Sequence, residues 1–141
     1  MQNKNKQIYI NIPVQDLGAS TSFYEALGFE KQKNFSDANA SGMKWSEEIY
    51  FMLLTHEFTK NFIEKKEIAD TQKVADAIFA LQMNSTEEVD EMVTKAKNVG
   101  ARTYKSEFNE QHDFMYTTSI VDPDGHILEI FYMDDSKLLQ K

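Results

Sequence analysis

Apolar and polar positions follow one order of patterns in the first half of the chain and repeat it in the second half. In residues 7–14, QIYINIPV, apolar side chains occupy every second position, which predicts a strand with one apolar face. Residues 16–28, DLGASTSFYEALG, space their large apolar side chains as a helix does, and Gly28 is suited to end that helix. Three further strands are predicted at 29–35, 42–46 and 49–54.

The second half begins with AIFALQM, residues 77–83, which predicts another strand. STEEVDEMVTKAKNVG follows, with an apolar stripe at helical spacing. Ser85 or Thr86 caps its start, Glu88 has the spacing of a capping box, and Gly100 ends the helix. The last strands are predicted at 101–105, 114–121 and 127–132, with DPDG as the tight turn before the final one.

The order strand–helix–strand–strand–strand therefore occurs twice, at an offset of roughly 70 residues. We expect an α+β fold in one domain over residues 1–141, with a βαβββ module at 7–55 and a second at 76–133. Residues 56–75 are charge-rich and predict a connector with one helical turn. One helix covers one face of each sheet, so the opposite faces are expected to form a half-open barrel around a shared cavity.

Charge and composition narrow the class of partner. The sequence has 23 acids against 15 bases, a formal charge of -8, which disfavours nucleic acid and anionic membranes. It has no cysteine, so disulfides, thiol catalysis and cysteine-bound metals are excluded. The start MQNKNKQ is unlike a signal peptide, and no apolar run approaches the ~20 residues of a membrane span. A cytoplasmic protein is expected.

One carboxylate interrupts the most apolar strand. In DPDGHILEIFY, Glu129 stands among Ile127, Leu128, Ile130 and Phe131. A buried carboxylate without a partner is costly or gives up its charge. Glu129 therefore faces water, bonds to a side chain such as Tyr9 or Asn11, or is bound by something from outside the chain.

Two segments of the sequence resemble one known family. VQDLGASTSFYEALGF is similar to the motif V-x-D-L-x-x-S-x-x-F-Y-x-x-L-G-F, and VDPDGHILEIFY to the ending D-P-D-G-x-x-x-E, of the glyoxalase/bleomycin-resistance/extradiol-dioxygenase superfamily, also called vicinal oxygen chelate proteins. The duplicated pattern between them resembles that family over residues 7–133. NIPVQDL, EEIYFMLLT and HDFMYTTSIVDPDGH also resemble a bacterial subgroup labelled "predicted lactoylglutathione lyase".

The resemblance implies two βαβββ modules around a U-shaped cavity. Enzymes of the family hold a divalent metal there, which acts as a Lewis acid, and relatives without a metal sequester a drug in the same trough. The resemblance places the four metal-ligand positions on Tyr9, Met52 (or Phe51), Ile78 and Glu129. Of these, only Glu129 suits a hard cation, so the usual metal centre is expected to be incomplete.

Histidines are the residues that would rebuild such a centre. The chain has His56, His112 and His126, and we interpret all three as exposed loop residues. The alternative is a replacement site formed by Glu129 with His56 or His112. His126 stands three positions before Glu129 on an extended chain, so it faces the opposite side.

Strand parity predicts the side chains of the cavity. The helices take the wholly apolar faces of 7–14 and 77–83, which turns the alternate positions inward. The expected cavity carries Tyr9, Asn11, Met52, Ile78, Gln82 and Glu129, with Tyr116 and Phe131 among its aromatic walls. Cavity-side strand positions are expected to carry no basic group, with Arg102, Lys44 and Lys105 at the rim, which disfavours glutathione.

These patterns leave three hypotheses. The first is a protein that binds a small metabolite or drug, with Glu129 holding a cationic group or acting as a general base beside Tyr9. The second is a divalent-metal lyase or isomerase of the glyoxalase type. The third is an interaction module whose cleft is filled by its own side chains. The resemblance also implies a symmetric homodimer, because members of this family often pair.

Overall fold

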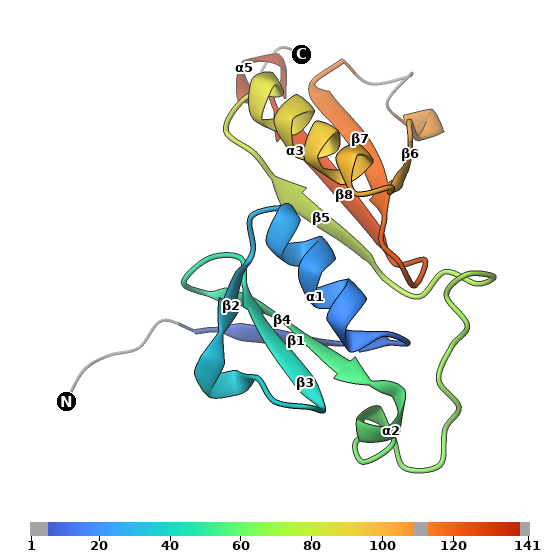
Figure 1. The fold of residues 1–141 in the computed structure, drawn as a ribbon. Helices are drawn as coiled ribbons and strands as arrows, with labels where there is room; N and C mark the ends of the chain where they lie inside the picture. The colour runs from blue at the N-terminus through green and yellow to red at the C-terminus, as the bar shows by residue number, and fades with distance from the viewer. Residues whose placement is uncertain (1–5, 109–112, 139–141) are drawn as a thin grey trace. The chain divides into compact units, whose positions relative to one another are not determined.

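A computed structural model describes residues 6–108 and 113–138 (Figure 1). The chain divides into two compact units, Met1–Ala69 and Asp70–Lys141, and each has its own four-stranded sheet. The α+β fold class and the duplicated order of elements are therefore confirmed. In the described part of the chain, every helix is too short or too polar to cross a membrane.

Unit 1 follows the predicted order of elements. Its strands are β1 (Ile8–Val14), β2 (Glu30–Gln32), β3 (Ala40–Lys44) and β4 (Ile49–Thr55), and its helices are α1 (Leu17–Ala26), a 3₁₀ turn η1 (Lys33–Phe35) and α2 (His56–Thr59). The sheet order is β1-β4-β3-β2, with β1 and β4 parallel and the other pairs antiparallel. Helix α1 packs on β3 and β4.

Unit 2 repeats this arrangement. Its strands are β5 (Ile78–Gln82), β6 (Arg102–Tyr104), β7 (Met115–Val121) and β8 (Ile127–Met133), and its helices are α3 (Thr86–Asn98) and α5 (Asp135–Leu138). The sheet order is β5-β8-β7-β6, with β5 and β8 parallel. Helix α3 packs on β7 and β8, as α1 does on the matching strands of unit 1.

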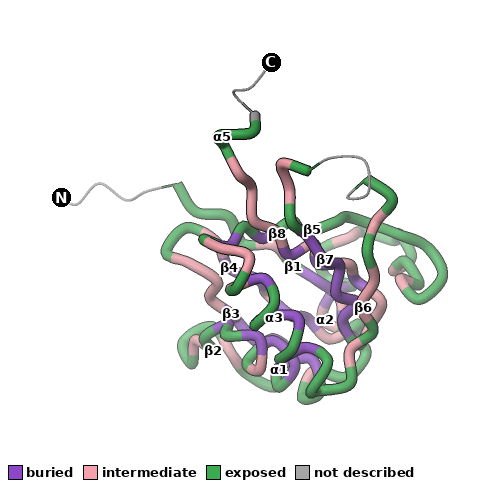
Figure 2. The backbone as a smooth tube through the Cα atoms, turned by 90° about the horizontal axis from the view of Figure 1, so that it is seen from above, coloured by how far each residue is buried: buried purple, intermediate pink, exposed green. Residues whose placement is uncertain are grey.

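The core of each unit lies between its helix and one face of its sheet (Figure 2). In unit 1, Tyr24 of α1 is fully buried and meets the buried Phe51 of β4 edge to face, with ring centroids 5.8 Å apart. In unit 2, Val89 and Ala96 of α3 are fully buried, and so is Leu128 of β8. Burial of each large apolar side chain contributes about 1.5–3 kcal/mol, so these two layers supply most of the stability.

The predicted capping box of α3 is present in a variant form, because Glu88 bonds to the backbone N–H of Asn84 rather than to that of the N-cap residue Ser85. The hydroxyl of Ser85 accepts a hydrogen bond from the backbone N–H of Glu88 at 3.1 Å, and the Glu88 carboxylate accepts one from the N–H of Asn84 at 3.0 Å. Helix α1 has a single side-chain cap, the Asp16 carboxylate, which accepts a hydrogen bond from the N–H of Ala19 at 3.0 Å. Both helix starts are therefore encoded locally.

The DPDG turn holds a segment that precedes β5, residues 70–76, which we call the strap. Thr71 Oγ1 donates to the carbonyl of Asp124 at 2.6 Å, and Gln72 Nε2 donates to the carbonyl of Pro123 at 2.9 Å. At Gly125 the φ angle is +95°, and a Cβ added there would lie 2.3 Å from the Thr71 carbonyl oxygen. Glycine is thus required twice over, for its backbone conformation and for the close approach of the strap.

Two expectations for local structure were wrong. The strand expected at 29–35 ends at Gln32 and continues as the 3₁₀ turn η1, which brings Phe35 back over the sheet. His126 is 1% exposed rather than a solvent-facing loop residue, because it follows the DPDG turn into the core. Its Nδ1 lies 3.2 Å from the Asp76 carboxylate at the end of the strap.

Candidate functional site

Each sheet has a helix-free face, opposite the face that α1 or α3 covers. Strand register identifies its members, because paired residues in neighbouring strands point to the same side. The parity predicted for β8 is confirmed: Leu128 and Ile130 are fully buried on the α3 side, and Glu129 between them lies on the helix-free face. That the two faces enclose a shared cavity stays a prediction.

The helix-free face of unit 1 is mainly aromatic and apolar. Tyr9 and Tyr50 are register partners with stacked rings, whose centroids are 4.6 Å apart. Asn11 is paired with Met52, and Met52 with Gly42 on the next strand. Phe35 meets Tyr9 edge to face and packs against Gly42, where an added Cβ would lie 2.8 Å from that of Phe35. The 3₁₀ turn therefore covers part of this face.

The helix-free face of unit 2 carries the polar groups. Glu129 is paired with Ala80 on one side and with Ser119 on the other, and Ser119 is paired with Tyr104. Gln82 and Phe131 form a pair two positions further along β5 and β8. Ile78 lies in the row on the other side of Glu129, paired with Ile127, and is 60% exposed.

The Glu129 carboxylate is the unusual group of this face. The residue is half-buried, and within the described residues neither a hydrogen bond nor an ion pair engages its side chain. Half-burial weakens its hydration, and a partner would normally compensate for that loss. The strand thus holds an acceptor that is available to a ligand.

The two units place their candidate metal positions in the same way. Tyr9 pairs with Tyr50, so Met52 stands two residues beyond the partner of Tyr9. Ile78 pairs with Ile127, so Glu129 stands two residues beyond the partner of Ile78. Met52 is therefore the counterpart of Glu129 in the internal duplication, and Tyr9 is the counterpart of Ile78.

This donor set does not fit a divalent metal. A thioether, an aliphatic side chain and a neutral phenol are poor ligands for hard cations, and one carboxylate is too few. His56 opens α2 and is exposed, and His112 lies outside the described residues. Across the described part of the chain, no group of three His, Asp or Glu side chains gathers in a geometry that could hold a metal ion.

Tyr116 does not belong to the helix-free face. It shares its side of β7 with the fully buried Ile120, and its hydroxyl donates to the Asp90 carboxylate of α3 at 2.6 Å. This hydrogen bond, followed by desolvation, raises the pKa of Tyr116 above its ordinary value. Lys105 lies 4.9 Å from the centre of the Tyr116 ring and donates to Thr118 at 2.6 Å, so it is held on the same side.

Basic residues do occur on the helix-free faces, contrary to expectation. Lys44 of β3 is paired with Tyr50, and Arg102 of β6 is paired with Val121. Lys44 already has an acidic partner, Glu47, at 2.7 Å, and that hydrogen bond raises the pKa of Lys44 above its ordinary value. Arg102, expected at the rim, thus lies on the helix-free face of unit 2.

Comparison with known proteins identifies the family. The model of the Glyoxalase/Bleomycin resistance protein/Dioxygenase superfamily matches residues 6–130. The chain belongs to this superfamily. Among curated proteins, none matches the chain.

Several solved structures share the fold. The hypothetical protein SA1046 from S. aureus is 23% identical, with a TM-score of 0.72 over 93% of this chain and 96% of its own. A superfamily enzyme from Burkholderia phytofirmans PsJN is 19% identical, with a TM-score of 0.72 over 89% of this chain and 96% of its own. A bleomycin-binding protein solved in complex with bleomycin is 21% identical, with a TM-score of 0.63 over 91% of this chain and 98% of its own. At these identities the likeness is one of fold.

Proposed function

We propose that this superfamily member binds a small organic molecule, a metabolite or a drug, with the Glu129 carboxylate as its polar anchor. The observation that carries the proposal is a half-buried carboxylate on the helix-free face of unit 2 that the described residues leave without a partner. Burial of an unpaired charge costs stability, so an apolar residue at this position would stabilise the fold more. A carboxylate here is therefore best explained by a role in binding.

The neighbours of Glu129 suit an organic ligand with a cationic or hydrogen-bond-donating group. Phe131 follows two positions later on the same face, and Tyr104 lies in the same row across the sheet. Hydrogen bonds to a charged group contribute roughly 1.5–3 kcal/mol, and aromatic faces add attraction for a cation. A ligand donor can thus bond to Glu129 while its apolar body lies on the rings.

A relative supports the class of ligand. The bleomycin-binding protein of the same fold was solved with bleomycin bound, so this architecture accommodates an organic drug. The stacked Tyr9 and Tyr50 of unit 1 provide a further flat surface of the kind that binds planar organic groups. The ligand of the present chain is proposed to share that broad chemistry.

The alternative function is a divalent-metal lyase or isomerase of the glyoxalase type. The donor set at Tyr9, Met52, Ile78 and Glu129 argues against it, for the reasons of ligand chemistry given above. Metal content after purification without chelator, followed by titration of Ni, Zn, Mn and Fe, separates the two. Stoichiometric uptake that is lost in Glu129→Ala would favour the lyase.

The proposal is tested by thermal denaturation with a library of metabolites and antibiotics. Wild-type protein is compared with Glu129→Gln and with Glu91→Gln, the same chemical change at an exposed position of α3. A ligand at 100 times its Kd stabilises the folded state by about 2.7 kcal/mol. We expect a ligand that raises the Tm of wild type and Glu91→Gln but not of Glu129→Gln. Equal shifts in all three proteins would contradict the role of Glu129.

A further inference from the structure

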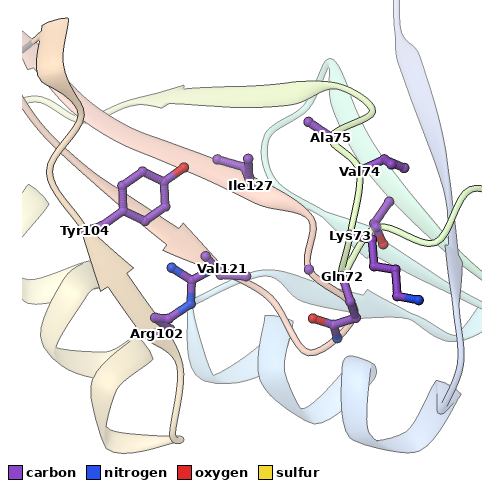
Figure 3. A pocket seen from close by; sticks show the side chains of 10 residues that line it. Gln72, Lys73, Val74, Ala75, Arg102, Tyr104, Val121 and Ile127 are labelled. Carbon is purple, nitrogen blue, oxygen red and sulfur yellow. The ribbon is translucent and has the colours of Figure 1, made fainter.

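A cavity in unit 2 lies between the strap and the helix-free face. It has a volume of ≈ 270 Å³, and its lining comes from the strap, from the DPDG turn and from strands β6, β7 and β8. Figure 3 shows residues 72–75 on one side, Arg102 and Tyr104 on the other, and Val121 and Ile127 between them. Typical pockets for small molecules begin at about 300 Å³, so this cavity fits one end of such a molecule.

The strap is a built wall rather than a passing loop. Thr71 and Gln72 are hydrogen-bonded to the DPDG turn, and Gly125 admits the strap backbone at close contact. At the far end of the strap, Asp76 lies 3.2 Å from the buried His126. These three attachments fix the width of the cavity, so its lining is organised before any ligand arrives.

The charged residues that line the cavity indicate the kind of ligand. The lining residues include two cations, Arg102 and Lys73, and no acid, although the chain as a whole carries a formal charge of -8. Lys73 extends away from Arg102 (Figure 3), so Arg102 is the cation beside the apolar floor. Its guanidinium lies 5.7 Å from the centre of the Tyr104 ring. Among the described residues, no carboxylate forms a salt bridge with Arg102.

We propose that this cavity is a subsite for an oxyanion, a carboxylate or phosphate attached to an apolar group, that pairs with Arg102. A guanidinium offers two parallel donors that match these anions, and the contact with Tyr104 restrains it before binding. Val121 and Ile127 contact the apolar part of the ligand. The inference rests on the proposed function, since Arg102 and Glu129 stand on the same helix-free face.

The placement of Arg102 and Glu129 adds a constraint on the whole ligand. Strand β7 separates the strands of Arg102 and Glu129, and along the strands the two residues are offset by two positions. Their Cα atoms are therefore roughly 12 Å apart. One molecule can therefore engage both, with an anionic group at Arg102 and a donor or cation at Glu129. The ligand class is a small organic molecule with both kinds of group.

The subsite is tested by NMR titration of isotope-labelled protein with benzoate, phenyl phosphate and the neutral benzamide at constant ionic strength. Benzoate or phenyl phosphate is expected to shift the amides of residues 71–75, 102–104 and 125 in a saturable way, while benzamide does not. The tighter of the two anions indicates carboxylate or phosphate as the natural group. Equal shifts with benzamide would overturn the proposal.

Two variants complete the test. Arg102→Gln is expected to weaken anion binding by roughly tenfold or more, whereas Lys97→Gln, on the exposed side of α3, leaves it unchanged. Unchanged anion binding in Arg102→Gln, with a preserved amide spectrum, would refute the proposed subsite. A library ligand that depends on Glu129 without any anion binding at Arg102 would refute this inference alone. Anion binding at Arg102 with no ligand that depends on Glu129 would refute the proposed function alone.

Discussion

The two units share a fold but differ on their helix-free faces. In unit 1 the position that matches Glu129 is Met52, and the face is lined by the stacked Tyr9 and Tyr50. Its basic residue, Lys44, is already paired with Glu47. In unit 2 the face carries Glu129 and Arg102, and within the described residues neither has an ion-pair partner.

This difference separates what the fold requires from what we propose for ligand binding. The helix sides of both units are buried apolar layers, with aromatic side chains such as Tyr24 and Phe51 in unit 1 and aliphatic ones such as Leu128 and Ile130 in unit 2. The opposite faces diverge in polarity, with an aromatic and apolar surface in unit 1 and, among the described residues, Glu129 and Arg102 without ion-pair partners in unit 2. The duplicated halves thus both keep an apolar core and differ in the polarity of their helix-free faces.

The largest expected effect concerns the strap of unit 2. Gly125→Ala combines a positive φ with a Cβ 2.3 Å from the Thr71 carbonyl oxygen, so we expect the free energy of unfolding to fall by about 3 kcal/mol. Chemical denaturation measures this change. The same substitution should also disturb the cavity beside Arg102.

Matched controls come from the glycines that follow the two helices. Gly28 and Gly100 have φ values of +102° and +88°, and an added Cβ at either would have no neighbour within 4 Å. Alanine at these positions should cost only the backbone strain, about 1 kcal/mol. A cost at Gly125 no greater than at Gly100 would show that the strap is not tightly packed against the turn.

The next effect exchanges the two equivalent residues. Met52→Glu introduces a charge into the apolar face of unit 1 and should lower the free energy of unfolding by about 2 kcal/mol. Glu129→Met removes the unpaired carboxylate from unit 2 and should raise it by about 0.5–1 kcal/mol. Urea denaturation of both variants tests the pair. A destabilised Glu129→Met would mean that Glu129 has a structural role.

The smallest effect lies on the helix side of unit 2. The bond to Asp90 raises the pKa of Tyr116 above 10.0, so the folded state favours the protonated phenol. This contribution to stability is present below the unfolded pKa, near 10, and is lost as the pH rises through the folded value. Tyr116→Phe should remove one late step from the absorbance titration of tyrosinate. An unchanged titration would contradict the assignment.

The sequence predicted most of the fold, because its signals are local. Alternation on β1 and β5, the helix stripes, the capping box at Ser85 and the DPDG turn each act within a few residues. The shorter strands were harder to predict. Strands β2 and β6 have only three residues each, which is too few for alternation to fix where they end or which way their side chains point.

The site was harder to predict, because its members meet only through tertiary structure. Tyr116 looked like an aromatic wall, but the parity of β7 and the acceptor Asp90 on α3 turn it to the helix side. His126 looked like a loop residue, but the DPDG turn directs it into the core. The cavity beside Arg102 depends on hydrogen bonds between residues about 50 positions apart, which no short pattern reveals.

The most direct test of the account is a map of amide chemical shifts for the best ligand of the thermal screen. We predict that the largest perturbations centre on Ala80, Ser119, Glu129 and Phe131, and that they vanish in Glu129→Gln. Perturbations confined to the helix sides of the sheets, or a map that Glu129→Gln leaves intact, would contradict the claim that this carboxylate binds the ligand.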